Sequence, residues 1–441
     1  MKKALLINPW FYDFKGYDEW MKPLGLLRIA SILKNEGWAI SFIDCLKRDQ
    51  KTNNIYGCGK YPYIEIDKPE IYKGIKRRYK KYGISESNFY EELQSISKPD
   101  IILIGSTMTY WYPGVFETIK IAKTHFKEVP IILGGIYATL CYDHALNNSS
   151  ADYIFKGTDI NDFLTLTQNI TGKKAICSYE DFKNHPSPSY NLLNPTKSIA
   201  VVTSLGCPFR CTYCASSILY SKISNTDPIT LAEIISKEIE NMNITDMAFY
   251  DDALMLNYEN NCAKFISKIR SRFPEMRFHT PNALHAKYID KKTAEHMKLN
   301  GFETIRLGFE FADSNLQTKS GGKVSTKDIN TATENLLSAG FNNRDIALYI
   351  MCGAPECGVE TIEKAIETCK DLKVRSQLVE YSPIPSTKMW HSFPQTDTIL
   401  AKDPLFHNNT YHIYKETVIP LEEYNRLKRL SNKYNSQILD S

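Results

Sequence analysis

The sequence predicts an α/β protein in which a Rossmann-like domain is followed by a partial parallel barrel. Two observations predict this fold. Short, solidly apolar runs recur along the chain, and segments with helically spaced apolar residues separate them. Apolar strands joined by helices are typical of parallel sheets that are buried on both faces. The chain has 441 residues, 43% of them hydrophobic and 24% charged, which is ordinary for a globular protein of two or three domains.

The first series of elements fills residues 1–165. Strands are expected at 3–8, 38–45, 101–105, 129–133 and 153–155, with helices such as 24–34 and 115–125 between them. Right-handed crossovers between these strands give a Rossmann-like domain. A polar insertion at 46–86 interrupts the series and contains a basic run at 73–81. Such a run is most often a solvated helix face, and a site for an anion is the alternative.

Residues 166–197 are expected to be a linker, because they include His185-Pro186-Ser187-Pro188 and Asn194-Pro195. A second series follows at 198–395, with strands expected at 199–204, 247–250, 277–280, 304–309, 346–351 and 378–381. Six strand–helix units predict a partial (β/α)6 barrel, in which the chemistry lies at the carboxyl ends of the strands. Residues 396–441 are expected to be a C-terminal extension.

Charge and hydropathy restrict where this protein works. The formal net charge is only +4, so it gives no argument for binding nucleic acid or a membrane surface. The apolar run at 4–7 is too short for a signal peptide, and no run approaches the length of a membrane helix. We therefore expect a cytoplasmic protein with no nucleic-acid or membrane partner, in a compartment where thiols stay reduced and can bind metals.

The strongest local signal is a cluster of three cysteines directly after the first barrel strand. Cys207, Cys211 and Cys214 are spaced C-x3-C-x2-C. Three thiols on one curled loop suit an iron–sulfur cluster, and a four-iron cluster would keep one iron open for another ligand. A structural zinc site is the alternative, although zinc sites typically use paired C-x2-C units.

This C-x3-C-x-aromatic-C pattern on the first strand of a partial barrel resembles the radical S-adenosylmethionine (SAM) superfamily. Later segments resemble the family's motifs in the right order. They include Gly308-Phe309-Glu310-Phe311, where Phe311 replaces the usual serine, and Gly353-Ala354-Pro355. The resemblance implies a [4Fe–4S] cluster that cleaves SAM reductively. The resulting 5′-deoxyadenosyl radical would abstract hydrogen from an unactivated carbon.

The resemblance also implies SAM-binding residues, most of them at the ends of the barrel strands. The candidates are Tyr213, Asp251, Asp252, Asn282, Arg306 and Glu310. Tyr213 would pack against adenine, and an aspartate would accept from the ammonium group of SAM. Helix caps and strand-end hydrogen bonds are the alternative roles, and Arg306 could equally pair with a core carboxylate.

A Rossmann-like unit ahead of such a barrel resembles the cobalamin-binding domain of cobalamin-dependent radical SAM enzymes. The candidate cobalamin residues are Leu24, Gly105, Ser106, Thr107, Gly134, Gly135, Tyr137 and Gly157. Glycines at strand ends allow a planar ligand to approach closely. Two departures from the family stand out. The first histidine of the chain is His125, so no Asp-x-His-x-x-Gly motif follows the first strand, and Tyr137 replaces the histidine of Gly-Gly-x-His. Another flat ligand, or a scaffold that binds nothing, is the alternative.

These observations lead us to expect a radical SAM enzyme that transfers a methyl group from methylcobalamin to a carbon radical. The alternatives are radical SAM cyclisation, rearrangement or C–S chemistry without methyl transfer, and an electron-transfer iron–sulfur protein. The expected partners are a small-molecule or natural-product substrate and an electron donor such as a flavodoxin or ferredoxin. Cys352 and Cys357 could form a redox pair or a second metal site, although buried structural cysteines are commoner.

Overall fold

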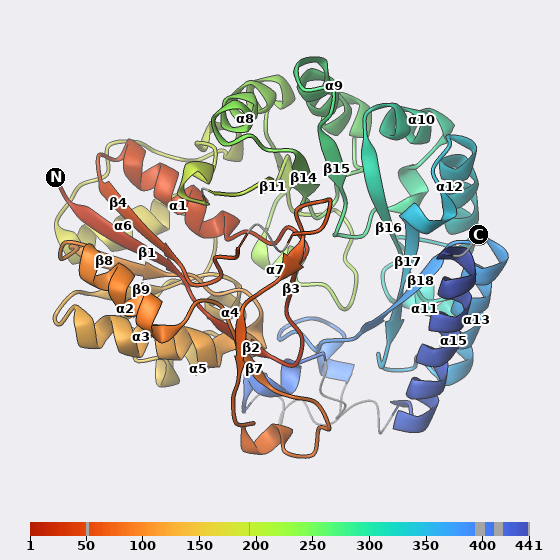
Figure 1. Ribbon diagram of the computed structural model, residues 1–441, viewed down its shortest axis with the longest axis horizontal. Helices are drawn as coiled ribbons and strands as arrows, with labels where there is room; N and C mark the ends of the chain where they lie inside the picture. Colours follow the sequence, from red (N-terminus) through yellow and green to blue (C-terminus); the bar gives the residue numbers. More distant parts are fainter. Residues whose placement is uncertain (50–52, 194, 393–401, 410–417, 440–441) are drawn as a thin grey trace. The chain divides into compact units, whose positions relative to one another are not determined.

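The computed structural model describes residues 1–49, 53–193, 195–392, 402–409 and 418–439 (Figure 1). Asn194 of the predicted linker and residues 396–401, 410–417 and 440–441 of the predicted extension lie outside the described residues. The chain forms two compact units. The first contains Met1–Ile199, Glu238–Asn243 and Asp397–Asn408, and the second contains Ala200–Lys237, Ile244–Thr396 and Asn409–Ser441. In the part of the chain that the structure describes, no helix is long and apolar enough to span a membrane. The boundaries expected for the domains, linker and extension stay predictions.

The first unit is built on a five-stranded sheet with the order β10-β9-β8-β1-β4. These strands are β1 (Lys3–Asn8), β4 (Ala39–Asp44), β8 (Ile101–Ile104), β9 (Ile131–Leu133) and β10 (Tyr153–Ile154). Neighbouring strands pair in parallel, with Ala4 opposite Ile40 on one side and Ile101 on the other. The predicted Rossmann-like sheet is therefore confirmed.

Both faces of this sheet are covered by helices (Figure 1). On one face, Leu5 and Ile7 pack with α2 (Glu86–Ser95) and α3 (Tyr112–His125). On the other, Ala4 and Leu6 pack with α1 (Leu24–Asn35) and α6 (Ile160–Thr171). Successive strand residues point to opposite faces, so a solidly apolar strand serves both cores. Two short helices, α4 (Ile136–Leu140) and α5 (Tyr142–Asn148), follow β9.

The polar insertion adds antiparallel strands to the first unit. β7 (Lys80–Tyr82) lies between β2 (Phe11–Asp13) and β6 (Tyr63–Glu65), and β3 (Tyr17–Asp18) pairs with β5 (Gly59–Lys60). The expectation that the basic run is a helix face was wrong. It follows the short 3-10 helix Glu70–Tyr72 and ends in β7. Pairing with β2 and β6 overrides the local preference, since strand pairing is a tertiary effect.

The main sheet of the second unit has six strands in the order β11-β14-β15-β16-β17-β18 among the described residues, as expected for the partial barrel. They are β11 (Ser198–Val201), β14 (Asp246–Phe249), β15 (Arg277–His279), β16 (Phe302–Glu310), β17 (Ile346–Cys352) and β18 (Arg375–Glu380). The pairs from β14 to β18 are parallel. Helices connect successive strands: α8 (Pro228–Met242), α9 (Cys262–Arg272), α10 (Lys291–Leu299), α12 (Thr326–Ser338) and α13 (Val359–Asp371).

The last helix, α15 (Leu421–Leu439), belongs to the second unit and packs on its sixth strand. Arg426 donates two hydrogen bonds to Glu363 of α13, both at 2.9 Å. Ser431 and Ser376 share a buried hydrogen bond of 2.8 Å. Through these contacts α15 covers β18, the last strand of the sheet.

Candidate active site

The cysteine loop begins at Gly206, a position where only glycine fits. Gly206 has φ +80, and a Cβ there would lie 2.9 Å from the carbonyl oxygen of Lys222. Cys207, Cys211 and Cys214 follow, and the helix α7 (Ser216–Leu219) begins directly after them. All three thiols are free; Cys207 and Cys211 are half-buried and Cys214 is exposed.

Asp252 ties the two ends of this loop together. Its Oδ2 accepts from the Gly206 N–H at 3.2 Å and from the Ser216 hydroxyl at 2.9 Å. The Ser216 N–H in turn donates to the sulfur of Cys214 at 3.4 Å. The second barrel strand therefore controls the loop that follows the first strand.

The neighbouring Asp251 has a different environment. It is 4% exposed, and it accepts from the N–H and hydroxyl groups of both Thr203 and Ser204 at 2.6–3.1 Å. Burial raises the pKa of Asp251 to about 6, even though these hydrogen bonds act in the opposite direction. All of these contacts are strand-end hydrogen bonds, which is the structural role considered for it above.

Glu310 forms a buried ion pair at the end of β16. Its Oε1 accepts from Lys323 Nζ at 2.9 Å, and the two side chains are only 10% and 14% exposed. Burial alone would lower the pKa of Lys323, but the charge and hydrogen bond of Glu310 outweigh burial and raise it. The ammonium group lies 5.6 Å from the centre of the Tyr213 ring.

A tight turn brings Lys323 to the cysteine loop. Gly321 has φ +125, and a Cβ there would lie 2.9 Å from Cys211 Cα. The Thr212 N–H donates to the Ser320 carbonyl at 2.9 Å. Sequence reasoning missed Lys323. The available signal was the Gly-Gly pair directly before it, which marks a turn that side chains would obstruct.

His285 is a second neighbour that sequence reasoning missed. Its Nε2 lies 3.9 Å from Cys207 Sγ, and its ring stacks on Phe209 at 5.1 Å. Burial lowers the pKa of His285 to about 4, so the ring is neutral at physiological pH. No spacing in the sequence links His285 to the cysteines, because it follows a different strand.

Two of the predicted SAM-binding residues show no contact with the cysteine loop among the described residues. Asn282 is exposed after β15. Arg306 donates to the carbonyl oxygens of Ile305 at 3.1 Å and of Asp345 at 3.4 Å. Because Asp345 directly precedes β17, the Arg306 guanidinium lies toward the amino end of that strand, whereas the cysteine loop follows a carboxyl end.

The predicted cobalamin residues cluster at the carboxyl edge of the first unit's sheet. The Ser106 hydroxyl donates to the Gly134 carbonyl at 2.6 Å, and Gly105 N–H donates to the Ile7 carbonyl at 3.2 Å. Gly135 has φ +99, and a Cβ there would lie 2.2 Å from the Ser106 carbonyl oxygen. The loops after β8 and β9 therefore touch through bare backbone.

The remaining predicted cobalamin residues differ in exposure. Thr107 is exposed, Leu24 is half-buried as the first residue of α1, and Gly157 has φ +111. Tyr137 is fully buried in the core, and its hydroxyl hydrogen-bonds His144 Nδ1 at 2.7 Å. Met108 follows β8, and Ile136 begins α4 after β9; both are large apolar side chains, 37% and 40% exposed, and sequence reasoning did not single them out.

The residues present fit an iron–sulfur cluster. Within the described ranges, no three His, Cys, Asp or Glu side chains are arranged to hold a single metal ion. Cysteines that hold a cluster bind different irons, so they need not converge on one point. Burial raises the pKa of Cys207 to about 11, so proton release accompanies metal binding. The Ser216 N–H and the Lys323 cation are groups that stabilise a thiolate sulfur.

Cys352 and Cys357 do not resemble such a site. Both are fully buried, and their thiols lie 3.8 Å and 3.6 Å from the carbonyl oxygens of Ile350 and Met351. The edge of the first sheet, in contrast, fits a flat ligand: Met108 and Ile136 offer apolar surface, and a Cβ at Gly157 would meet no heavy atom within 4 Å.

Comparisons with known proteins find one family model and several similar proteins. Residues 201–373 match the model of the radical SAM superfamily. An uncharacterized methyltransferase of Pyrococcus horikoshii is 24% identical over 341 residues, which cover 70% of this chain and 73% of that protein. An uncharacterized methyltransferase of Synechocystis is 25% identical over 448 residues, which cover 96% of this chain and 74% of that protein.

Two solved structures share the fold. TsrM of Kitasatospora setae is a radical SAM methyltransferase solved with tryptophan substrate and a SAM analogue. It matches with a TM-score of 0.65 at 12% identity, over 88% of this chain and 75% of that chain. The cobalamin-dependent SAM radical enzyme OxsB matches with a TM-score of 0.57 at 13% identity, over 91% of this chain and 56% of that chain. Residues 201–373 of this chain therefore form a radical SAM domain, and the chain as a whole shares the fold of TsrM and OxsB.

Proposed function

We propose that this protein is a cobalamin-dependent radical SAM methyltransferase that methylates an unactivated carbon of a small-molecule substrate. One observation carries the proposal. A single chain combines a C-x3-C-x2-C loop after the first strand of a partial barrel with a parallel sheet whose carboxyl edge is glycine-lined and apolar. The likeness to TsrM, which was also solved with cobalamin and a [4Fe–4S] cluster, supports it.

Cys207, Cys211 and Cys214 are the proposed cluster ligands. Asp252 holds the two ends of their loop, and Thr212 fixes its middle through the backbone of Ser320. A loop restrained in this way presents three thiols while needing little reorganisation on metal binding.

The proposed SAM contacts surround this loop. The Glu310–Lys323 pair offers one charge of each sign, which matches the ammonium and carboxylate groups of an amino acid. Tyr213 offers an aromatic face beside them, and Asp252 and Asn282 stand after the neighbouring strands. Asp251 holds the loop through Thr203 and Ser204, and Arg306 is left out of the proposed site because of its contacts at the amino end of β17.

The proposed cobalamin surface consists of the loops after β8 and β9, with Gly105, Ser106, Gly134 and Gly135 as its backbone floor. When they are bound, the cluster and SAM supply a radical that removes hydrogen from carbon, and cobalamin supplies the methyl group. The proposed partners are an electron donor, such as a flavodoxin or ferredoxin, and a small-molecule substrate. A cytoplasmic location is part of the same proposal.

The test uses the full chain, purified and reconstituted anaerobically with iron, sulfide and hydroxocobalamin. Dithionite and SAM are then added, and 5′-deoxyadenosine, S-adenosylhomocysteine and bound corrinoid are quantified. We expect all three from the native protein. A Cys211→Ala variant should lose 5′-deoxyadenosine but keep the corrinoid, because Cys211 belongs to the second unit and the corrinoid surface to the first.

Other outcomes would contradict the proposal. Formation of 5′-deoxyadenosine without bound corrinoid would support radical SAM chemistry without methyl transfer. Absence of deoxyadenosine from a protein with a full complement of iron would leave an electron-transfer role.

A further inference from the structure

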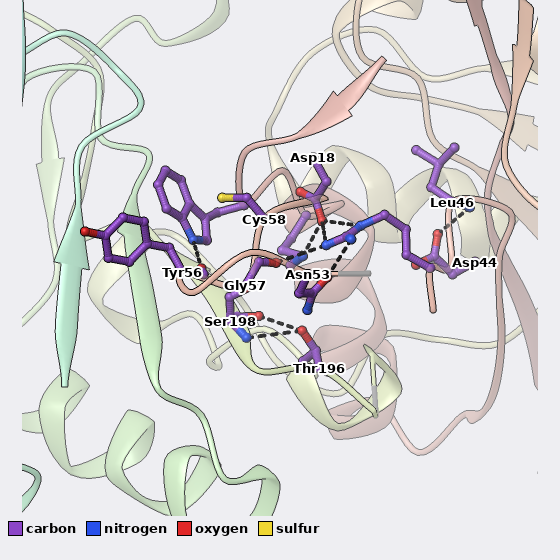
Figure 2. Close-up of polar contacts among 12 residues, drawn as sticks. Asp18, Asp44, Leu46, Asn53, Tyr56, Gly57, Cys58, Thr196 and Ser198 are labelled. Carbon is purple, nitrogen blue, oxygen red and sulfur yellow. Dashed lines mark hydrogen bonds and ion pairs between the residues drawn. The ribbon is translucent and has the colours of Figure 1, made fainter. Parts of the chain in front are cut away.

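Buried polar side chains in the two units have different kinds of partner. In the first unit, Arg48 donates to Asp18 Oδ2 at 2.8 Å, to Asn53 Oδ1 at 2.7 Å and to the Gly57 carbonyl oxygen at 3.0 Å (Figure 2). These bonds join the polar insertion to the loop after β1, so their role is structural. In the second unit, the ring of the buried His285 faces a cysteine sulfur instead.

His285 reaches that sulfur from a different strand of the barrel. It follows β15, whereas Cys207 follows the first barrel strand. Its Nε2 lies 3.9 Å from Cys207 Sγ, a long N–H···S contact, and the residue is 5% exposed. The contact therefore joins two loops at the carboxyl ends of the strands, where barrels of this kind carry their chemistry.

The His285 ring is held in place from two sides. The preceding residue, Leu284, donates its N–H to the Arg306 carbonyl oxygen at 2.8 Å and accepts from the Gly308 N–H at 3.2 Å, so β16 fixes the backbone. The ring stacks on Phe209, with ring centres 5.1 Å apart and an angle of 20° between the planes. A side chain that its neighbours hold in this way is preorganised for a functional contact.

The chemistry of the two groups decides which of them donates. A thiolate that binds iron carries no proton, so Cys207 can only accept. A neutral imidazole has one N–H, and its partners determine which nitrogen carries the proton. Because a thiolate faces Nε2, a proton on this nitrogen gives an N–H···S hydrogen bond, whereas a bare nitrogen would set two lone pairs against each other.

Charged groups act on both partners of this contact. Asp252 and the other two cysteines of the loop act on Cys207, and Lys323 acts on His285. The ring itself is neutral, because burial lowers its pKa to about 4. Replacing His285 by an uncharged residue therefore leaves the charges as they are, and it changes only the N–H donor and the packing of the ring.

We propose that His285 donates a hydrogen bond from Nε2 to the Cys207 sulfur and thereby raises the reduction potential of the cluster on the cysteine loop. This inference rests on the proposed function, because it requires a [4Fe–4S] cluster on Cys207, Cys211 and Cys214. Hydrogen bonds to the sulfurs are among the features that set the potential of such clusters. One electron from the external donor increases the negative charge on the sulfurs, so an N–H donor stabilises the reduced form more than the oxidised form. His285 is thus a positioning residue that acts through Cys207.

The test is a redox titration of the full chain with a reconstituted cluster and without SAM, in which EPR measures the reduced cluster at each potential. His285→Phe keeps a flat ring that can stack on Phe209, but it removes the N–H. At a fixed potential we expect the ratio of reduced to oxidised cluster to fall about tenfold in this variant, which corresponds to about 59 mV for one electron.

Two further variants separate the hydrogen bond from the packing. His285→Gln loses the ring but keeps an N–H donor of similar reach, so it should recover most of the ratio. His296→Phe is the matched control, since it makes the same change on α10, where the ring nitrogens hydrogen-bond the hydroxyl groups of Tyr258 and Ser267, both at 3.0 Å. The control should leave the ratio unchanged.

A second measurement detects the nitrogen directly. With ¹⁵N-labelled histidine, pulsed EPR of the reduced native protein should show a weak ¹⁵N coupling, and His285→Phe should lose it. A strong coupling would mean that a histidine binds iron itself, and no coupling would mean that no histidine N–H reaches the cluster. Either result would overturn the inference.

The remaining outcomes also decide. Equal potentials in the native protein and His285→Phe, at equal iron content, would show that the ring only packs. An equal loss in His285→Phe and His285→Gln would assign the effect to packing. If His285→Phe takes up no cluster, the ¹⁵N coupling of the native protein still decides. A native protein that holds no four-iron cluster would overturn the proposed function as well.

Discussion

The Glu310–Lys323 ion pair should contribute far more to stability than a surface pair of the same composition. Replacing Lys323 by Met leaves the Glu310 carboxylate buried without its partner. Replacing Glu310 by Gln leaves the Lys323 ammonium group buried without its partner. At 2.9 Å, two unit charges attract each other by about 6 kcal/mol at an effective dielectric constant of about 20. Desolvation offsets part of this attraction. Breaking a buried pair on one side therefore costs about 3–5 kcal/mol.

The chain offers a matched control pair. Lys319 and Glu356 lie 2.8 Å apart, but their side chains are 67% and 61% exposed. Solvent screens such a pair, and exposed pairs often contribute nothing measurable to stability. The two pairs have nearly the same distance and differ mainly in burial.

The assay is a double-mutant cycle on the free energy of unfolding, measured with urea on the full chain without added cofactors. Lys323→Met, Glu310→Gln and the double variant form one cycle, and Lys319→Met, Glu356→Gln and their double variant form the other. We expect a coupling of about 2–4 kcal/mol in the first cycle, with the double variant recovering stability lost in each single variant. Equal coupling in both cycles would refute the argument that burial decides the strength of the pair.

Three further predictions concern the cluster, a buried carboxylate and the cobalt. Changing Cys207, Cys211 and Cys214 together to Ala should abolish the brown colour and the EPR signal of the reduced protein; a full-strength signal in that variant would place the cluster elsewhere. The folded-state pKa of Asp251, about 6, lies above its ordinary value of 3.8, so its stabilising contribution is present below pH 3.8 and is lost as the pH rises through 6. The free energy of urea unfolding of the native protein should therefore fall by about 2 kcal/mol relative to Asp251→Asn between pH 4 and pH 7, and parallel pH profiles would contradict this. Because no histidine occurs in residues 1–124, EPR of the cobalt(II) form should lack superhyperfine splitting from a coordinated nitrogen, and its presence would show a nitrogen ligand on the lower face.

Most of the fold could be predicted from the sequence, because its signals are local. The apolar runs at 3–8 and 101–105 are long enough to identify strands buried on both faces, and both lie in one parallel sheet. The cysteine spacing is also a local signal, since three thiols within eight residues lie on one loop whatever the tertiary structure is. The basic run at 73–81 was wrongly predicted to be a helix face, because its composition is compatible with a helix or a strand. The pairing of β7 with β2 determined the strand.

The surroundings of the cysteines depend on the tertiary structure alone. Lys323 and His285 reach the loop from turns after other strands, and nothing in their local sequence records that contact. Asp251 and Asp252 are adjacent identical residues, yet one is enclosed by Thr203 and Ser204 while the other ties Gly206 to Ser216. Successive side chains at a strand end point in different directions, so their partners follow from packing.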